Sequence, residues 1–345
     1  MQKKASALDL GSVGSLRKGH DYVARMNRIS KIVMTLLLVS FAVFIIIAAL
    51  AILKMGVSNF FATIKSINAF YYSLAILTVF IGYLMRFPKW SIYMDKLGIK
   101  IGLKKNFMIY LSMYSMELTP GRWGRAIVSY TINKLTKVKF ARTFPAVVAD
   151  IFTDFLGFVI LLLGSAFLMH KYILPSLVIS ALLIVPFVFL YVRKPFEFIR
   201  KKFSKSKRLR GFLEVGSLYF KSNKLLDKSA YASSLGYTVP SMFLNGVSLY
   251  FVILAFGIHL DPGFIPTVIF IYATSVVLGM ISGIPGALGV TDAVLLAALV
   301  GFLGGAGISF GLASVITIFF RISTLWFVEL FGFAALSYTF RYWKQ

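Results

Sequence analysis

Long apolar runs separated by short polar segments make up most of the chain. A helix needs about 20 apolar residues to cross a bilayer, and six runs are long enough: residues 33–53, 67–85, 146–169, 173–192, 230–256 and 308–340. The pattern predicts an all-α polytopic membrane protein with about six full transmembrane helices.

Two further apolar stretches, residues 107–133 and 265–304, are each broken in the middle by the spacing Pro-Gly-x-x-Gly. The breaking residues are Pro120, Gly121 and Gly124 in the first stretch and Pro285, Gly286 and Gly289 in the second. The arms are residues 107–118 and 126–132 in the first stretch and 265–281 and 292–303 in the second. These arms are short for full crossings, so we expect two broken re-entrant helical hairpins.

Basic residues fix the expected orientation. Most of the 37 Lys and Arg residues fall before the first run, between residues 86 and 105, between 134 and 142, between 193 and 228, or at the C-terminus. Since Lys and Arg collect in cytoplasmic loops, we expect both termini in the cytoplasm. The first hairpin then enters from the cytoplasm and the second from outside. This arrangement is an inverted-topology repeat, as in many transporters.

The same pattern divides the chain. We expect a cytoplasmic basic N-terminal segment at 1–32, a first membrane half at 33–192, a cytoplasmic basic linker at 193–229 and a second membrane half at 230–345. No stretch alternates strands and helices as an appended soluble enzyme domain would.

Composition supports a membrane protein. Hydrophobic residues make up 59% of the 345 residues, and the mean hydropathy is +0.83. The net charge of +25 is better explained by cytoplasmic loops and anionic lipid headgroups than by nucleic acid. The chain has no cysteine and three scattered histidines, so we expect neither a metal site nor a cofactor.

Charged residues at the two breaks are the candidate binding groups. Arg122 and Arg125 follow Pro120 at the expected start of a half-helix, where arginine and free N–H groups suit a phosphate. The alternative is that both arginines extend to the membrane interface. Asp292 lies near the start of the other half-helix, where a carboxylate caps the helix or interacts with its dipole.

Few other charges lie within membrane segments, and such charges mark pathways or ion pairs. Asp150 and Asp154 are four residues apart on one helix face. We therefore expect either that the pKa of at least one of the two carboxyl groups is raised or that the pair recruits a cation. Glu117 stands just before the first break. Arg321 lies in the last run with Glu329 two turns later, and we expect Arg321 either to pair with Asp154, Asp292 or Glu329 or to handle substrate or protons.

Two sequence motifs in these regions resemble those of a known protein family. Residues 119–124 read Thr-Pro-Gly-Arg-Trp-Gly, and residues 284–293 read Ile-Pro-Gly-Ala-Leu-Gly-Val-Thr-Asp-Ala, followed by Phe-Phe-Arg at 319–321 and Leu-Trp at 325–326. The chain resembles the lysylphosphatidylglycerol synthase transmembrane region family, also called flippase-like integral membrane proteins. It departs from the family pattern at Arg125, where an acidic residue is usual, and at Ile151, where arginine is common, whereas Asp154 matches.

The resemblance implies a membrane-embedded lipid translocase fold with the two motif loops and Arg321 near the lipid path. It does not imply lysylphosphatidylglycerol synthesis, because the soluble aminoacyl-transferase domain of full synthases does not follow the membrane region within these 345 residues.

The favoured function is a flippase-like transporter of the cell (plasma) membrane that moves an anionic phospholipid or lipid-linked headgroup between leaflets. The alternatives are a membrane-embedded enzyme acting on a lipid carrier, with Asp150, Asp154 or Asp292 as base, a transporter of a small solute or ion, or a lipid-binding scaffold. No metal-ligand cluster or nucleotide loop supports the enzyme. We expect anionic membrane lipids as partners and leave a homo-oligomer open.

Overall fold

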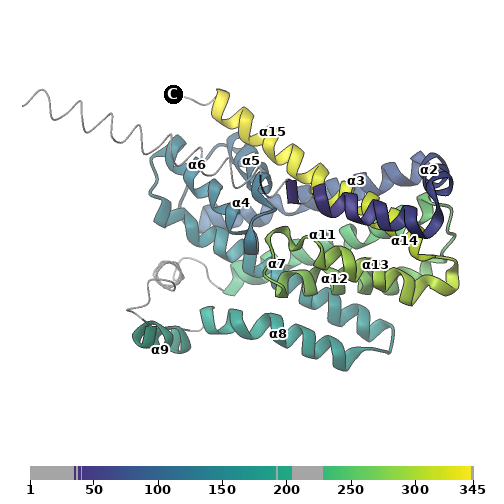
Figure 1. Cartoon of the computed structure of the whole chain (residues 1–345). Helices are drawn as coiled ribbons and strands as arrows, with labels where there is room; N and C mark the ends of the chain where they lie inside the picture. Colours follow the sequence, from purple (N-terminus) through teal and green to yellow (C-terminus); the bar gives the residue numbers. More distant parts are fainter. Residues whose placement is uncertain (1–34, 36–37, 40, 192, 204–227, 343–345) are drawn as a thin grey trace, which may run out of the picture.

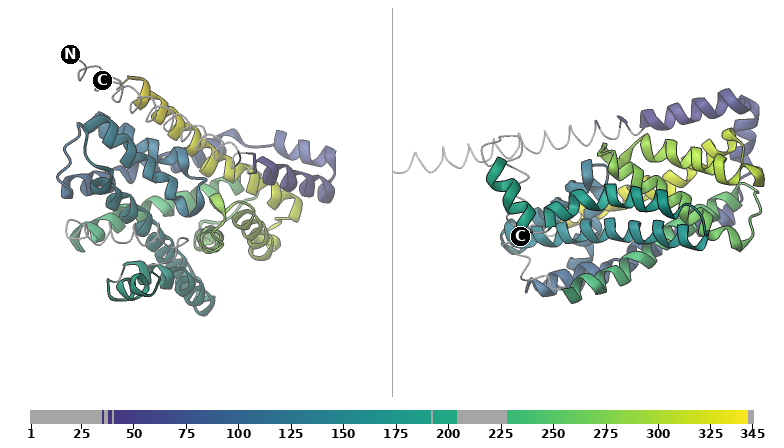
Figure 2. Two further views of the ribbon diagram at one scale, coloured as in Figure 1. Left: turned by 60° about the vertical axis from the view of Figure 1, so that its left-hand side comes forward. Right: turned by 90° about the horizontal axis from the view of Figure 1, so that it is seen from below.

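The computed structural model describes residues 35, 38–39, 41–191, 193–203 and 228–342, and within these ranges it contains helices and turns but no strand. The helices form an elongated bundle (Figures 1 and 2). By length and apolar composition, six of its helices could cross a membrane. The all-α membrane fold is therefore confirmed. The predicted segment at 1–32 and residues 204–227 of the predicted linker lie outside the described residues.

Four predicted spans reappear as long helices. They are α3 (Ala69–Met85) with its continuation α4 (Phe87–Lys96), α7 (Phe140–Leu168), α11 (Lys228–Ala255), and the last run from α14 (Phe310–Arg321) through a short π-helix (η7, Ile322–Trp326) to α15 (Phe327–Tyr342). The predicted span at 173–192 corresponds to α8 (Ile173–Tyr191), which α9 (Arg193–Phe203) follows at an angle (Figure 2).

Two predicted loops are wrong. The first span, described from Phe41 to Met55, bends by 111° into α2 (Val57–Lys65), where we expected a loop. Gly56 makes this bend with φ of 81°, a backbone conformation that glycine adopts at little cost. Residues 86–96 were also expected to be loop but continue the preceding helix as α4. Trp90, Tyr93 and Met94 are buried along α4, and this helical spacing holds it against the bundle.

The first hairpin is short, as predicted. Its incoming arm is α5 (Leu103–Ser112) with a 3₁₀ turn, η1 (Met113–Met116), and its outgoing arm is α6 (Ile127–Thr136). Between them the motif forms a 3₁₀ segment, η2 (Pro120–Ala126), with the proline near its start. Proline suits that position because its missing N–H would have no helical partner there.

The second hairpin consists of α12 (Ile265–Ile281), a 3₁₀ turn η5 (Pro285–Ala287) and α13 (Val290–Leu303). With their flanking 3₁₀ turns, η4 (Pro262–Phe264), η5 and η6 (Gly304–Ala306), the arms reach 20 and 22 residues. By length and composition each arm could cross a membrane, which the sequence pattern did not predict.

The two hairpins approach each other from opposite ends of the bundle. Figure 1 shows α5 and α6 beside α4 at one end, whereas the connection from α13 to α14 lies at the other end with α2. The tips meet between these ends. A Cβ added at Gly286 would lie 3.3 Å from the Cα of Leu118, so the absence of a side chain lets the two tips touch. The inverted repeat itself stays a prediction.

Candidate functional site

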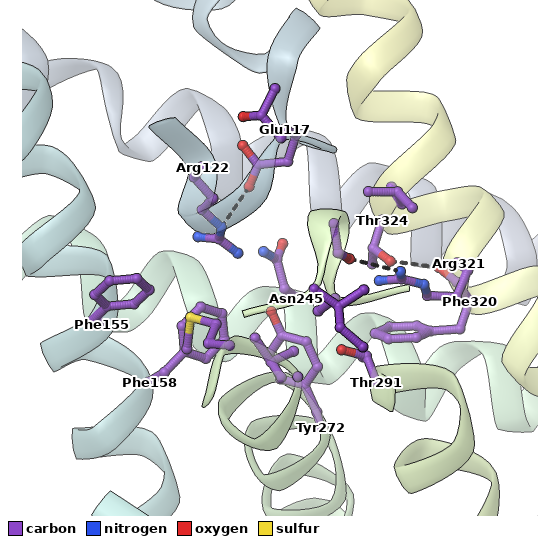
Figure 3. A pocket seen from close by; sticks show the side chains of 18 of the residues that line it. Glu117, Arg122, Phe155, Phe158, Asn245, Tyr272, Thr291, Phe320, Arg321 and Thr324 are labelled. Carbon is purple, nitrogen blue, oxygen red and sulfur yellow. Dashed lines mark hydrogen bonds and ion pairs between the residues drawn. The ribbon is translucent and has the colours of Figure 1, made fainter. Parts of the chain in front are cut away.

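A cavity lies between the two hairpin tips (Figure 3). The first tip lines it with Glu117, Thr119 and Arg122. The second tip contributes Gly283, Ile284, Gly286, Ala287 and Thr291. The empty volume of the cavity is about 850 Å³, which includes the part that is open to solvent. Broken backbone at membrane depth needs such a setting, because its free polar groups are costly against lipid.

Helices complete the wall with aromatic and polar side chains. Phe155 and Phe158 come from α7, Asn245 from α11, Tyr272 from α12 and Arg321 from the end of α14 (Figure 3). The cavity therefore combines ring surfaces with an arginine on either side, Arg122 from one tip and Arg321 near the other.

Asp154 is the centre of a buried charge cluster behind the first tip. Its Oδ1 lies 2.9 Å from Lys89 Nζ, and its Oδ2 lies 2.8 Å from Arg125 Nη1 and 3.2 Å from Arg122 Nη1. Arg86 Nη1 is 3.7 Å away. Asp154 is fully buried, and an isolated carboxylate could not stay charged there. The four cations compensate its charge.

Asp150 and Glu117 complete this cluster. Asp150 lies one helical turn before Asp154, 2.6 Å from Lys89 Nζ and 2.7 Å from Arg125 Nη1. Glu117 accepts two parallel hydrogen bonds from Arg125, each 3.0 Å long, and lies 2.9 Å from Arg122 Nε. Such paired contacts between guanidinium and carboxylate fix geometry as well as charge. The first tip is thereby tied to α7 and α4.

Arg125 has a different place from the one predicted. The sequence assigned it to a headgroup together with Arg122, but its side chain is fully buried among Glu117, Asp150 and Asp154. It is not among the residues that line the cavity. Arg122, whose side chain is 19% exposed, lines the cavity instead.

At the second tip, Asp292 both caps a helix and forms an ion pair. Its Oδ2 accepts a hydrogen bond from the N–H of Gly289, 2.9 Å away. Its Oδ1 lies 2.9 Å from Arg321 Nε, without hydrogen-bond alignment. The two functions that we considered as alternatives are therefore served by different oxygens of one carboxylate.

The other predicted residues lie at or beside the tips. Pro120 and Gly121 are in η2, and the N–H of Gly124 donates to Thr119 Oγ1 at 2.7 Å. Pro285 begins η5, and Gly286 accepts a hydrogen bond from Arg321 Nη2 through its carbonyl at 3.4 Å. Glu329 is buried in α15, and among the residues that the structure describes it has no ion-pair partner.

Three leucines close the contact between the tips. Leu118 from the first hairpin, Leu288 from the second and Leu325 from the π-helix form a separate buried cluster, with Val43 packed against it. We call these three leucines the tip cluster. The π-helix that supplies Leu325 starts directly after Arg321, and such local widening of a helix is frequent at functional sites.

Sequence reasoning missed Arg86, Lys89 and the π-helix. Arg86 and Lys89 were counted as cytoplasmic loop charges, because the positive-inside rule counts lysines and arginines wherever they stand. The signal that could have placed them is the spacing of Arg86, Lys89, Trp90 and Tyr93, which lie on one face of a helix.

No group of metal-ligating side chains is found within the described ranges.

Two comparisons with known proteins agree with a membrane protein. Residues 37–332 match the profile of the family described as lysylphosphatidylglycerol synthase TM region. The chain belongs to this family. It is also similar to a protein of Methanothermobacter thermautotrophicus named UPF0104 membrane protein, with 25% identity over 332 residues, 86% of this chain and 95% of that protein.

Proposed function

We propose that the protein is a flippase-like transporter that moves an anionic phospholipid or lipid-linked headgroup between the leaflets of the cell membrane. The observation that supports this proposal is the cavity between two broken hairpins, with Arg122 and Arg321 in its wall. Guanidinium groups bind phosphate through several donors at once. The aromatic and apolar part of the wall, with Phe155 and Phe158, suits the start of an acyl chain.

In this proposal both termini are cytoplasmic and the first hairpin opens toward the cytoplasm, as the basic loops predict. The headgroup occupies the cavity while the acyl chains stay in lipid. Movement of the two tips past each other changes the leaflet to which the cavity opens. No chemical step is assigned to the protein, so lipid masses stay the same during transport.

The experiment is lipid translocation in liposomes that contain the purified protein. Arg321→Ala removes the cation beside the second tip, and we expect translocation of a labelled phosphatidylglycerol to fall to the rate of empty liposomes while the circular dichroism spectrum is unchanged. Arg341→Ala is the matched control, because Arg341 is exposed near the end of α15, and it should keep the full rate. Full activity in Arg321→Ala would contradict the proposal.

Mass spectrometry of the lipids in the same liposomes separates this function from the alternative of an enzyme acting on a lipid carrier. Incubation with candidate activated donors should leave every lipid mass unchanged. A new lipid mass that depends on Asp150, Asp154 or Asp292 would favour the enzyme.

A further inference from the structure

The buried charges behind the first tip do not balance. Among the residues that the structure describes, four cations share three carboxylates, namely Arg86, Lys89, Arg122 and Arg125 with Glu117, Asp150 and Asp154. With every group in its usual ionised form, the cluster has one positive charge in excess. An excess charge in surroundings of low polarity is costly unless a counter-ion meets it.

Among the cations of this cluster in the described part of the chain, Arg122 is the most exposed. The side chains of Lys89, Arg125 and Asp154 are 0% exposed, whereas that of Arg122 is 19% exposed. Its Nε and Nη1 contact Glu117 and Asp154, and its Nη2 has no partner within the part of the chain that the structure describes. The guanidinium lies at the cavity wall, 5.7 Å from the centre of the Phe158 ring. A ligand in the cavity therefore reaches the unbalanced charge directly.

The other charges near the cavity do not cancel this excess. Arg321 is paired with Asp292, and this pair is neutral as a whole. Glu329 is buried near the backbone of Leu118 and is absent from the cavity wall. Within the described residues no cation lies within ion-pair distance of Glu329, so we do not count it as part of the cluster. Figure 3 shows Arg122 and Arg321 on either side of the same space.

From this balance we infer that the cavity selects a phosphodiester headgroup with a single negative charge. The inference rests on the proposed function and names its substrate class. A phosphodiester monoanion brings the cluster to neutrality, and its two free oxygens can face Arg122 and Arg321. A phosphomonoester carries about 1.5 to 2 negative charges at neutral pH and overcompensates. A zwitterionic headgroup brings its own cation and leaves the excess in place.

Binding measured by native mass spectrometry on the full chain in detergent micelles tests this inference without any translocation. The probes are phosphatidylglycerol as the monoanion, phosphatidic acid as the phosphomonoester and phosphatidylcholine as the zwitterion, with matched acyl chains. The wild type should bind phosphatidylglycerol most tightly, by about tenfold over phosphatidylcholine, as expected for a charge-assisted hydrogen bond. Equal binding of the three lipids would overturn the inference.

Two variants change the charge balance in opposite directions. Arg122→Gln removes the excess, so the preference for phosphatidylglycerol over phosphatidylcholine should fall about tenfold. Glu117→Gln raises the excess to two, so the preference should move toward phosphatidic acid. The double variant returns the count to one but lacks the accessible guanidinium, so its preference for phosphatidylglycerol over phosphatidylcholine should stay as low as that of Arg122→Gln. Each result is the ratio of the amounts of two lipids bound to the same protein sample. A partial loss of folded protein lowers both amounts equally and leaves this ratio unchanged.

A competition experiment with a soluble phosphodiester shows whether the ligand is a lipid or a soluble molecule. If glycerophosphoglycerol does not displace phosphatidylglycerol at millimolar concentration, the ligand is the lipid. If it displaces the lipid fully and inorganic phosphate does not, the same charge rule holds for a soluble phosphodiester. An Arg122→Gln variant with the wild-type lipid ratios would overturn the inference. Charge selectivity without translocation in liposomes would instead contradict only the proposed function.

Discussion

The two hairpin tips share one spacing, Pro-Gly-x-x-Gly, but different interactions hold them. The first tip is tied down by Glu117, Arg122 and Arg125, which join a buried cluster on α4 and α7. Within the described residues, the second tip has one ion pair, between Asp292 and Arg321, and a helix cap. A helix break in a membrane protein can therefore be stabilised by shared buried charges or by backbone conformation with few charges.

The two hairpins also differ in the length of their helices. The helices of the first hairpin, α5 and α6, have 10 residues each, whereas α12 and α13 of the second hairpin have 17 and 14 residues. The short hairpin has more ion pairs at its tip. The long hairpin has one ion pair among the described residues, and its helix α12 packs against α7 and α13. Substitutions in the two tips should therefore have unequal effects.

The largest effect is expected at the centre of the charge cluster. Asp154→Asn leaves four cations with two carboxylates, and breaking a buried pair in this way costs about 3–5 kcal/mol. We expect the free energy of unfolding in micelles to fall by that amount. Asp95→Asn is the control, because Asp95 is exposed on α4, and its effect should stay within about 0.5 kcal/mol. A similar small effect for Asp154→Asn would show that the cluster does not stabilise the first tip.

A smaller effect is expected at the second tip. Asp292→Asn removes the ion pair with Arg321, but the amide oxygen of asparagine can still accept the hydrogen bond from Gly289. The expected loss is about 1–3 kcal/mol, measured in the same micelles. Arg321, which lines the cavity, can be hydrated there when its partner is lost. A loss equal to that of Asp154→Asn would contradict the difference between the tips.

The sequence identified the parts of the molecule where local chemistry decides the structure. Pro120 and Pro285 cannot continue a preceding helix because they lack an N–H, and each begins a 3₁₀ turn at the predicted break. The pairing of Asp292 with Arg321 was one of three alternatives, because spacing along a chain does not say which helices become neighbours. Only the packing of α13 against α14 decides between them.

The positions of Arg86 and Lys89 could not be predicted from the distribution of charges along the sequence. Arg86 and Lys89 follow an apolar run, as cytoplasmic loop residues do, yet they lie in a buried cluster with Asp150 and Asp154. The carboxylates that compensate them come from α7, more than 60 residues later in the chain. The place of Arg125 depends on the same tertiary contacts. A sequence pattern can indicate that buried carboxylates need cations, but it cannot say which cations the fold brings to them.

The proposed transport requires the two tips to move past each other, and a cross-link between them tests this requirement most directly. Leu118 and Leu288 belong to the tip cluster, and the chain has no cysteine of its own. In a Leu118→Cys, Leu288→Cys double variant, a short cleavable thiol linker should reduce phosphatidylglycerol translocation in liposomes to background, and cleavage should restore it. Undiminished translocation by the fully cross-linked protein would contradict the account.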